Sequence, residues 1–298
     1  MSFSTDVKQE LLRASQEQES CCAEAQLYGL LLFGHAFSAG EISLRTESRV
    51  IADYAREQVR ALALAAAQVE AVGRKWEVSI PRPEDRLRLL ERFGHAKNEI
   101  SLHIVRENFA CDDCRTAFLR GVFLACAAVS APQRQYHLEF YVGYRKLARA
   151  LAELLAEAGL PPKLCQRKGI WLVYYKDSGQ IEDILAGLGA QLSMLRVVNI
   201  KIEKDMRNNV NRLVNFEMAN MDRSSGAAAA QLAAIEQLRR GPGLDALPET
   251  LREAAILREQ NPEASLQELC NLTAQPVTRS GMNHRLKRLV EMSGEMTK

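Results

Sequence analysis

Two long apolar segments stand out in the hydropathy pattern, at about residues 23–38 and 115–130, and each predicts a helix that is buried on most sides. The two segments align at a fixed offset of 92 residues (117 − 25), with six identical positions over residues 25–38 and 117–130. One shared position is a glycine, Gly29 in the first copy and Gly121 in the second. Glycine lets two helix backbones approach closely, so we expect one supersecondary unit in two copies that pack through these helices.

The segments after each apolar helix show the spacings of strands and amphipathic helices. After the first, strands are predicted at 41–46, 75–80 and 99–105, a long helix at 48–72 and a short helix at 85–93. After the second, strands are predicted at 136–142, 163–167 and 170–175, and helices at 144–159 and 181–188. Each copy therefore approximates to the order αββαββα, with one strand of the first copy looking short.

The rest of the chain is predicted to be helical. Residues 4–20 form a polar amphipathic helix, 197–220 a connecting helix rich in Asn and Arg, and 226–238 an Ala-rich helix that ends before a Gly-Pro-Gly hinge. The expected domains are an N-terminal helix (1–21), a duplicated domain (22–202, with repeats at about 22–108 and 115–202), a helical linker (203–243) and a small all-α domain (244–298). The fold class is α+β, with a pseudo-twofold duplicated domain.

The last domain has the pattern of a helix-turn-helix. A first helix runs to about Gln260, a capping box at Ser265 and Glu268 starts a short second helix, and a third begins after Thr278 or Ser280 and runs to about residue 291. On the third helix Met282, Leu286 and Leu289 form an apolar stripe, and the opposite face is basic. No acid occurs between residues 277 and 290. The alternative is a small helical bundle with a solvated basic face.

Composition limits where the protein works and what it binds. The formal net charge is only +2, so a surface for nucleic acid must be a local patch. Residues 1–8 lack the pattern of a signal peptide, and no apolar segment reaches the roughly 20 residues that span a bilayer. We expect a cytoplasmic, nucleoid-associated protein with no membrane contact, no small-molecule substrate, and seven cysteines that are mostly reduced.

Three sequence segments carry a resemblance to a known family: residues 205–215 (DMRNNVNRLVN), 243–248 (GLDALP) and 280–286 (SGMNHRL). Over essentially its whole length the chain resembles WhiA, a family of bacterial regulators of sporulation and cell division. The resemblance implies a duplicated domain similar to LAGLIDADG homing endonucleases, joined to a C-terminal helix-turn-helix. It also implies transcription regulation linked to cell division, chromosome segregation or sporulation.

The resemblance also identifies where a nuclease would hold its metal. In homing endonucleases the acid at the eighth motif position of each helix binds the metal that activates water. Those positions here are Gly34 and Cys126, and the sixth positions are Leu32 and Leu124. None supplies the oxygen that Mg²⁺ requires. We therefore expect no catalytic residue, no metal in the nuclease position, no cofactor and no enzyme activity.

The third helix of the last domain is the predicted DNA reader. Arginine and asparagine can pair bidentately with guanine and adenine edges in the major groove, and other cations meet phosphates. The predicted partner is double-stranded promoter DNA, with transcription machinery or division proteins as further partners. The alternative function is that of an adaptor, which binds mainly protein partners and binds DNA only secondarily. The predicted DNA-binding residues are Thr278, Arg279, Ser280, Asn283, His284, Arg285, Lys287 and Arg288, with Arg207 and Arg212 adding backbone contacts.

Four cysteines precede the two apolar helices, and Cys22 and Cys114 correspond at the 92-residue offset. If the helices pack side by side in the same direction, these thiols converge with those of Cys21 and Cys111. Three interpretations stay open: a tetrahedral zinc site, a reversible disulfide, or four unconnected thiols at helix starts. A single CxxC pair in the sequence does not distinguish among these three interpretations.

Overall fold

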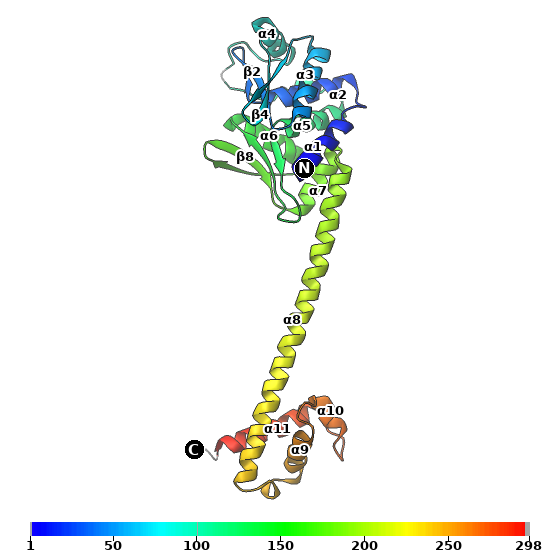
Figure 1. The fold of residues 1–298 in the computed structure, drawn as a ribbon, viewed down its shortest axis with the longest axis vertical. Helices are drawn as coiled ribbons and strands as arrows, with labels where there is room; N and C mark the ends of the chain where they lie inside the picture. The colour runs from blue at the N-terminus through cyan, green and yellow to red at the C-terminus, as the bar shows by residue number, and fades with distance from the viewer. Residues whose placement is uncertain (1, 100, 296–298) are drawn as a thin grey trace. The chain divides into compact units, whose positions relative to one another are not determined.

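The computed structural model describes residues 2–99 and 101–295. It divides into two compact units, Met1–Lys204 and Asp205–Lys298. The first unit contains two four-stranded antiparallel sheets with helices packed on them, and the second is helical (Figure 1). The mixed helix and sheet class is therefore confirmed. No helix within the described residues combines the length and the hydropathy that crossing a bilayer requires.

The first unit is built from two copies of the order αββαββα, preceded by α1 (Phe3–Ala14). The sheets have equivalent strand orders, β1-β2-β4-β3 and β5-β6-β8-β7, which confirms the duplication. The first copy consists of α2 (Ser20–Leu32), β1 (Ala36–Phe37), β2 (Ile42–Thr46), α3 (Arg49–Ala63), β3 (Gln68–Val72), β4 (Lys75–Ser79) and α4 (Pro83–Arg92). The second consists of α5 (Asp112–Cys126), β5 (Ala127–Val129), β6 (Leu138–Val142), α6 (Arg145–Glu157), β7 (Lys163–Arg167), β8 (Ile170–Tyr175) and α7 (Ser178–Leu188), after a short 3-10 turn, η1 (Arg106–Asn108).

Several predicted boundaries in the first unit are wrong. The helix expected over 48–72 ends at Ala63, because Leu64 adopts a left-handed conformation (φ 49°), and the rest of that segment contains strand β3. No strand lies among the described residues of 99–105; residue 100 is outside them. The first helix ends at Ala14 instead of residue 20. The apolar helices end earlier than expected, because β1 begins at Ala36 and β5 directly follows α5.

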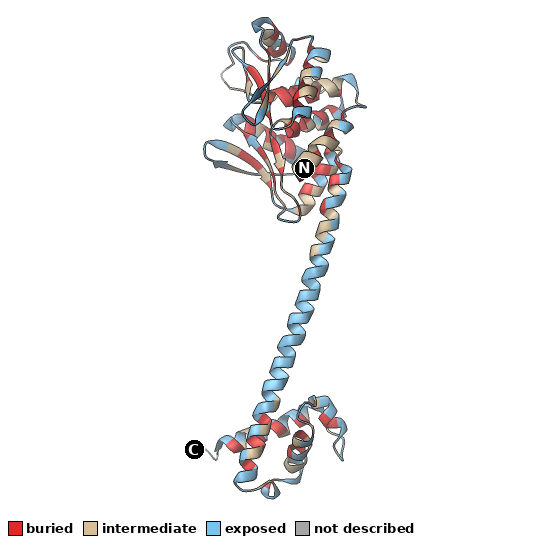
Figure 2. Cartoon of the chain, in the orientation of Figure 1, coloured by how far each residue is buried: buried red, intermediate tan, exposed pale blue. Residues whose placement is uncertain are grey.

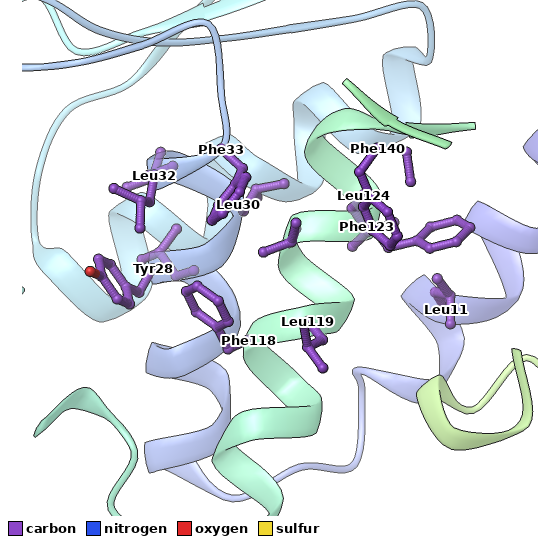
Figure 3. Packing of buried hydrophobic residues seen from close by; sticks show 14 of the residues in the cluster. Leu11, Tyr28, Leu30, Leu32, Phe33, Phe118, Leu119, Phe123, Leu124 and Phe140 are labelled. Atoms are coloured by element: carbon purple, nitrogen blue, oxygen red, sulfur yellow. The ribbon is translucent and has the colours of Figure 1, made fainter. Parts of the chain in front are cut away.

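Helices α2 and α5 pack against each other at the centre of the first unit, as the shared glycines predict. A Cβ atom on Gly121 would lie 2.1 Å from the carbonyl oxygen of Gln26, and one on Gly29 would lie 2.3 Å from that of Phe118. Such distances are too short for any side chain, so the backbones touch because both positions are glycine. Around this contact, buried side chains such as Tyr28 and Phe118 pack together, with their rings tilted by 44° (Figure 3).

One continuous helix, α8 (Gln191–Arg240), replaces the two helices expected at 197–220 and 226–238. Gly226 therefore lies in a helix interior. Glu10 accepts hydrogen bonds from the backbone N–H groups of Leu192 and Ser193, which satisfies two of the free donors at the start of α8. Every residue from 205 to 227 is exposed (Figure 2).

The second unit closes around its own apolar core. After η2 (Leu244–Ala246), three helices follow, α9 (Glu249–Gln260), α10 (Leu266–Asn271) and α11 (Arg279–Glu295). The predicted capping box at Ser265 and Glu268 is present at the start of α10. The predicted core stripe of α11 is fully buried, in a cluster consisting of Ile235, Leu238, Leu247, Ala254, Ala255, Leu269, Cys270, Met282, Leu286 and Leu289.

Candidate nucleic-acid interface

The orientation of α11 is fixed by its cap and its apolar stripe. The hydroxyl of Thr278 accepts a hydrogen bond from the backbone N–H of Gly281 at 3.1 Å, so Thr278 is the capping residue and Ser280 lies inside the helix. Met282, Leu286 and Leu289 recur at i, i+4 and i+7 and are buried. The opposite side of the helix must therefore face solvent.

The solvent side of α11 carries most of the predicted DNA-binding residues. Arg279, Asn283 and Lys287 follow one another at i, i+4 and i+8, and all three are exposed. Ser280, His284 and Arg288 form a neighbouring exposed row. Arg288 also donates a hydrogen bond to Glu291 at 3.2 Å, one turn further on. Because acids are absent from α11 until Glu291, its first three turns present cations and one amide, with no carboxylate of the same helix beside them.

Arg285 has a different environment from its neighbours. Its side chain is only 20% exposed, and its guanidinium lies 3.2 Å from the carboxylate of Glu253 on α9. Glu253 also accepts a hydrogen bond from the backbone N–H of Ala274, in the turn before α11. Arg285 thus connects the third helix to the first and to the turn, which is a contact inside the domain.

Arg207 and Arg212 lie on the exposed part of α8, away from α11. They are five positions apart, which at 3.6 residues per turn separates their side chains by about 140° around the helix. At 1.5 Å per residue, Arg212 lies roughly 35 Å along α8 from Ile235, where the helix enters the core of the second unit. The structure therefore does not bring these two arginines together with the basic side of α11.

One buried arginine was not anticipated from the sequence. Arg258 at the end of α9 is 3% exposed, and its guanidinium donates to the carbonyl oxygen of Ala264 at 2.6 Å. Burial lowers the pKa of this guanidinium. An arginine on an amphipathic helix ordinarily indicates a solvated position. The sequence therefore does not predict that Arg258 is buried and hydrogen-bonded to the turn. Arg258 fixes the turn between α9 and α10, and with it the position of α10 against α11.

A lysine lies beside Gly34 and Cys126, the two positions at which the sequence predicts the loss of metal-binding acids. Gly34 and Cys126 lie at the ends of α2 and α5 and border a cavity of about 810 Å³ that Lys8 also lines. Lys8 donates a hydrogen bond from Nζ to the carbonyl oxygen of Leu124 at 3.2 Å, and burial lowers its pKa. Burial also raises the pKa of Cys126 to about 12. Sequence reasoning missed Lys8, because nothing in its local pattern relates it to residues more than a hundred positions away.

The sheet surface of the first unit is not strongly basic at its readable positions. Arg45 on β2 lies opposite Glu77 on β4, and the two side chains form an ion pair at 2.5 Å. Tyr141 on β6 donates a hydrogen bond to Glu139 on the same strand. A positive charge that is already paired attracts a phosphate weakly, so the basic side of α11 is the stronger candidate for nucleic acid.

Comparisons with known proteins agree with this arrangement. The WhiA LAGLIDADG-like domain matches residues 115–207, and the WhiA C-terminal HTH domain matches residues 210–293. Probable cell division protein WhiA of Heliobacterium modesticaldum is 38% identical, covering 98% of this chain and 96% of its own. The same-named protein of Clostridium novyi is 42% identical, covering 70% of this chain and 68% of its own. The crystal structure of full-length DUF199/WhiA from Thermatoga maritima has a similar fold, with a TM-score of 0.59, 23% identity and 99% coverage of both chains.

The fold and the last three helices define a class of protein in which a degenerate LAGLIDADG-like domain is joined to a helix-turn-helix domain. The chain belongs to the WhiA family.

Proposed function

We propose that the chain is a sequence-specific DNA-binding regulator of transcription, acting in cell division, chromosome segregation or sporulation. Its place of action would be the nucleoid in the cytoplasm. The observation that carries the proposal is the exposed side of α11, which holds cations and an amide with no acid among them and is the third helix of a helix-turn-helix domain. A helix of this kind, following a short helix and a turn, is the part that enters the major groove.

Individual roles follow from the chemistry of each side chain. Arg279 and Asn283 would read guanine and adenine edges, since both can form two hydrogen bonds in one plane. Lys287 and Arg288 would contact phosphates, as would Ser280 and His284 beside them. Thr278 and Arg285 would act by holding the helix, given their contacts with Gly281 and Glu253. Arg207 and Arg212 would add backbone contacts separately, from different sides of α8.

Asn283→Ala is expected to cost about 1–3 kcal/mol of binding to the cognate site and to relax the base preference at one position, because a bidentate base contact is lost. Arg288→Ala should weaken binding to all sequences alike. Fluorescence anisotropy with promoter fragments and scrambled duplexes, each over a salt series, distinguishes the two effects.

Lys163→Ala is the matched control for these variants, because Lys163 is an exposed lysine on β7 in the other unit. Its affinity should equal that of the wild type. If Asn283→Ala and Arg288→Ala also bind like the wild type, α11 does not read DNA. Mapping of bound sites across the genome, for the full chain and for the chain without residues 244–298, then tests the same assignment in cells.

We also propose that the chain does not cleave DNA. The support is chemical: Gly34 and Cys126 provide no oxygen ligand, and the Lys8 ammonium beside them disfavours a divalent cation. Supercoiled plasmid carrying bound promoter sequences should therefore stay intact with Mg²⁺ or Mn²⁺. Cleavage that depends on the divalent metal and persists in a second, independently purified sample would overturn this part of the proposal.

A second candidate function, an adaptor for protein partners in cell division, is favoured by one observation. Met206, Val210, Leu213 and Phe216 on α8 are each more than half exposed, which is unusual for large apolar side chains on a helix. Division proteins or the transcription machinery would be the partners. Deleting residues 244–298 discriminates between the two functions, because regulation that persists without the helix-turn-helix favours the adaptor.

A further inference from the structure

Four cysteine side chains from the two repeats meet where α2 and α5 begin. Cys21 and Cys22 lie in the first turn of α2, Cys111 immediately precedes α5, and Cys114 lies in its first turn. Because α2 and α5 pack side by side, residues about 90 positions apart in the chain come together here. All four Sγ atoms lie within 4.8 Å of one another.

The distances between the sulfur atoms fit a tetrahedron. The Cys111–Cys114 and Cys22–Cys111 pairs are 3.4 and 3.5 Å apart, and the Cys21–Cys111 and Cys22–Cys114 pairs are 3.7 and 3.9 Å apart. Four thiolates at the usual Zn–S length of about 2.3 Å have sulfurs about 3.8 Å apart. A disulfide requires about 2.05 Å, so the sulfurs are at the spacing of ligands and not of bonded pairs.

The surroundings of the cluster also suit a metal. Cys22 and Cys114 are buried, whereas Cys111 is exposed, so an ion has a path from solvent and its complex is then covered on one side. The first turns of two helices place their positive ends at the sulfurs, which favours thiolates. Four thiolates within 4.8 Å of one another repel strongly, so a dication is needed to hold them together.

We propose that Cys21, Cys22, Cys111 and Cys114 form a structural zinc site that joins the two repeats at the beginning of α2 and α5. Binding of Zn²⁺ releases the four thiol protons to solvent and leaves a complex with a net charge of −2. Four sulfur ligands fill a tetrahedral site and leave no position for water, so the ion is structural and not catalytic. The site lies at the opposite end of the helix pair from Gly34 and Cys126.

The test is the zinc content of the full-length chain, purified without chelator and measured by mass spectrometry of the metal. One zinc per chain is expected for the wild type and less than a tenth of that for Cys111→Ser. Because Cys111 is exposed, this substitution leaves the core packing unchanged. Cys165→Ser is the matched control, since Cys165 is a half-buried cysteine on β7 outside the cluster, and it should keep the full zinc content.

Replacement of zinc by Co²⁺ provides a second readout, because the visible spectrum of cobalt changes only when a substituted cysteine is a metal ligand. The wild type and Cys165→Ser should show the visible absorption bands of tetrahedral cobalt thiolate, and Cys111→Ser should lose or shift them. Removing the zinc should also lower the thermal midpoint of unfolding of the first unit, which the fluorescence of Trp76 and Trp171 follows.

Three results would overturn the proposal. One is a zinc content well below one per chain even after Zn²⁺ is added to the reduced protein. Another is an equal zinc content in the wild type and Cys111→Ser. The third is a metal-free protein in which thiol titration under denaturing conditions, without reductant, finds fewer than the seven free thiols of the sequence. Together with peptide mapping that places the bonds among these four cysteines, that result would mean that the cluster forms disulfides.

Discussion

Leu286→Ala is expected to lower the free energy of unfolding of the helix-turn-helix unit by about 2–5 kcal/mol and to reduce DNA binding in proportion to the unfolded fraction. Leu286 is 0% exposed and lies between Met282 and Leu289 in the core of the second unit. Removing its side chain leaves a cavity in a small core that has few other apolar contacts to compensate. The exposed basic side of α11 depends on this core, because the buried stripe supplies the apolar packing that holds the helix against the rest of the unit.

The two tryptophans allow this effect to be assigned to the correct unit. Trp76 on β4 and Trp171 on β8 are the only tryptophans in the sequence, and both lie in the first unit. Urea unfolding of Leu286→Ala should shift the circular dichroism transition of the helical unit and leave the tryptophan fluorescence transition unchanged. Leu272→Ala is the matched control, because Leu272 is 51% exposed and its truncation should cost little. Equal stability of the two variants would show that α11 does not pack as described.

Gly121→Ala is expected to destabilise the first unit by about 3 kcal/mol or more, although it adds a single methyl group. The added Cβ would lie 2.1 Å from the carbonyl oxygen of Gln26 and 2.9 Å from the backbone nitrogen of Leu30. Both atoms belong to the backbone of α2, so no side chain can rotate away to make room. The two helices would have to separate, and the close packing around Tyr28 and Phe118 would be lost.

The measurement for Gly121→Ala is urea unfolding followed by tryptophan fluorescence. Gly187→Ala serves as the control, because Gly187 lies in helix α7 and a Cβ atom there would meet nothing within 4 Å. Alanine is the better helix former by roughly 1 kcal/mol, so Gly187→Ala should be neutral or slightly stabilising. A Gly121→Ala protein as stable as the wild type would contradict the backbone contact between the repeats.

The parts of the fold that the sequence predicted correctly are those in which one strong local pattern determines the outcome. The shared glycines predicted the helix contact, the alternating segments predicted β2, β4, β6, β7 and β8, and the capping box predicted the start of α10. One failure lies where periodicity continued past a break. Ala66 and Val69 extend the helical spacing of α3, but the left-handed conformation of Leu64 ends that helix. Leucine rarely adopts this conformation, so the residue type at position 64 does not predict the end of the helix.

In the candidate site, the exposed residues of α11 could be predicted from the sequence, but their contacts with distant segments could not. The exposed row of Arg279, Asn283 and Lys287 follows directly from the buried stripe of α11, since the two sides of a helix determine each other. The ion pair of Arg285 with Glu253 and the position of Lys8 beside Cys126 depend on contacts between distant segments. A pattern within one helix contains no information on which distant charge will lie against it.

The close approach of α2 and α5 at Gly29 and Gly121 also bears on how the chain folds during synthesis. The partner glycine of α2 is made 92 residues later, which at about 5–20 residues per second is a delay of roughly 5–20 s. During that interval the side of α2 that packs on α5 has no partner, because α5 is not yet complete. The nascent first repeat is therefore exposed to aggregation and to chaperones until most of the second repeat has emerged, and the two copies complete their fold together.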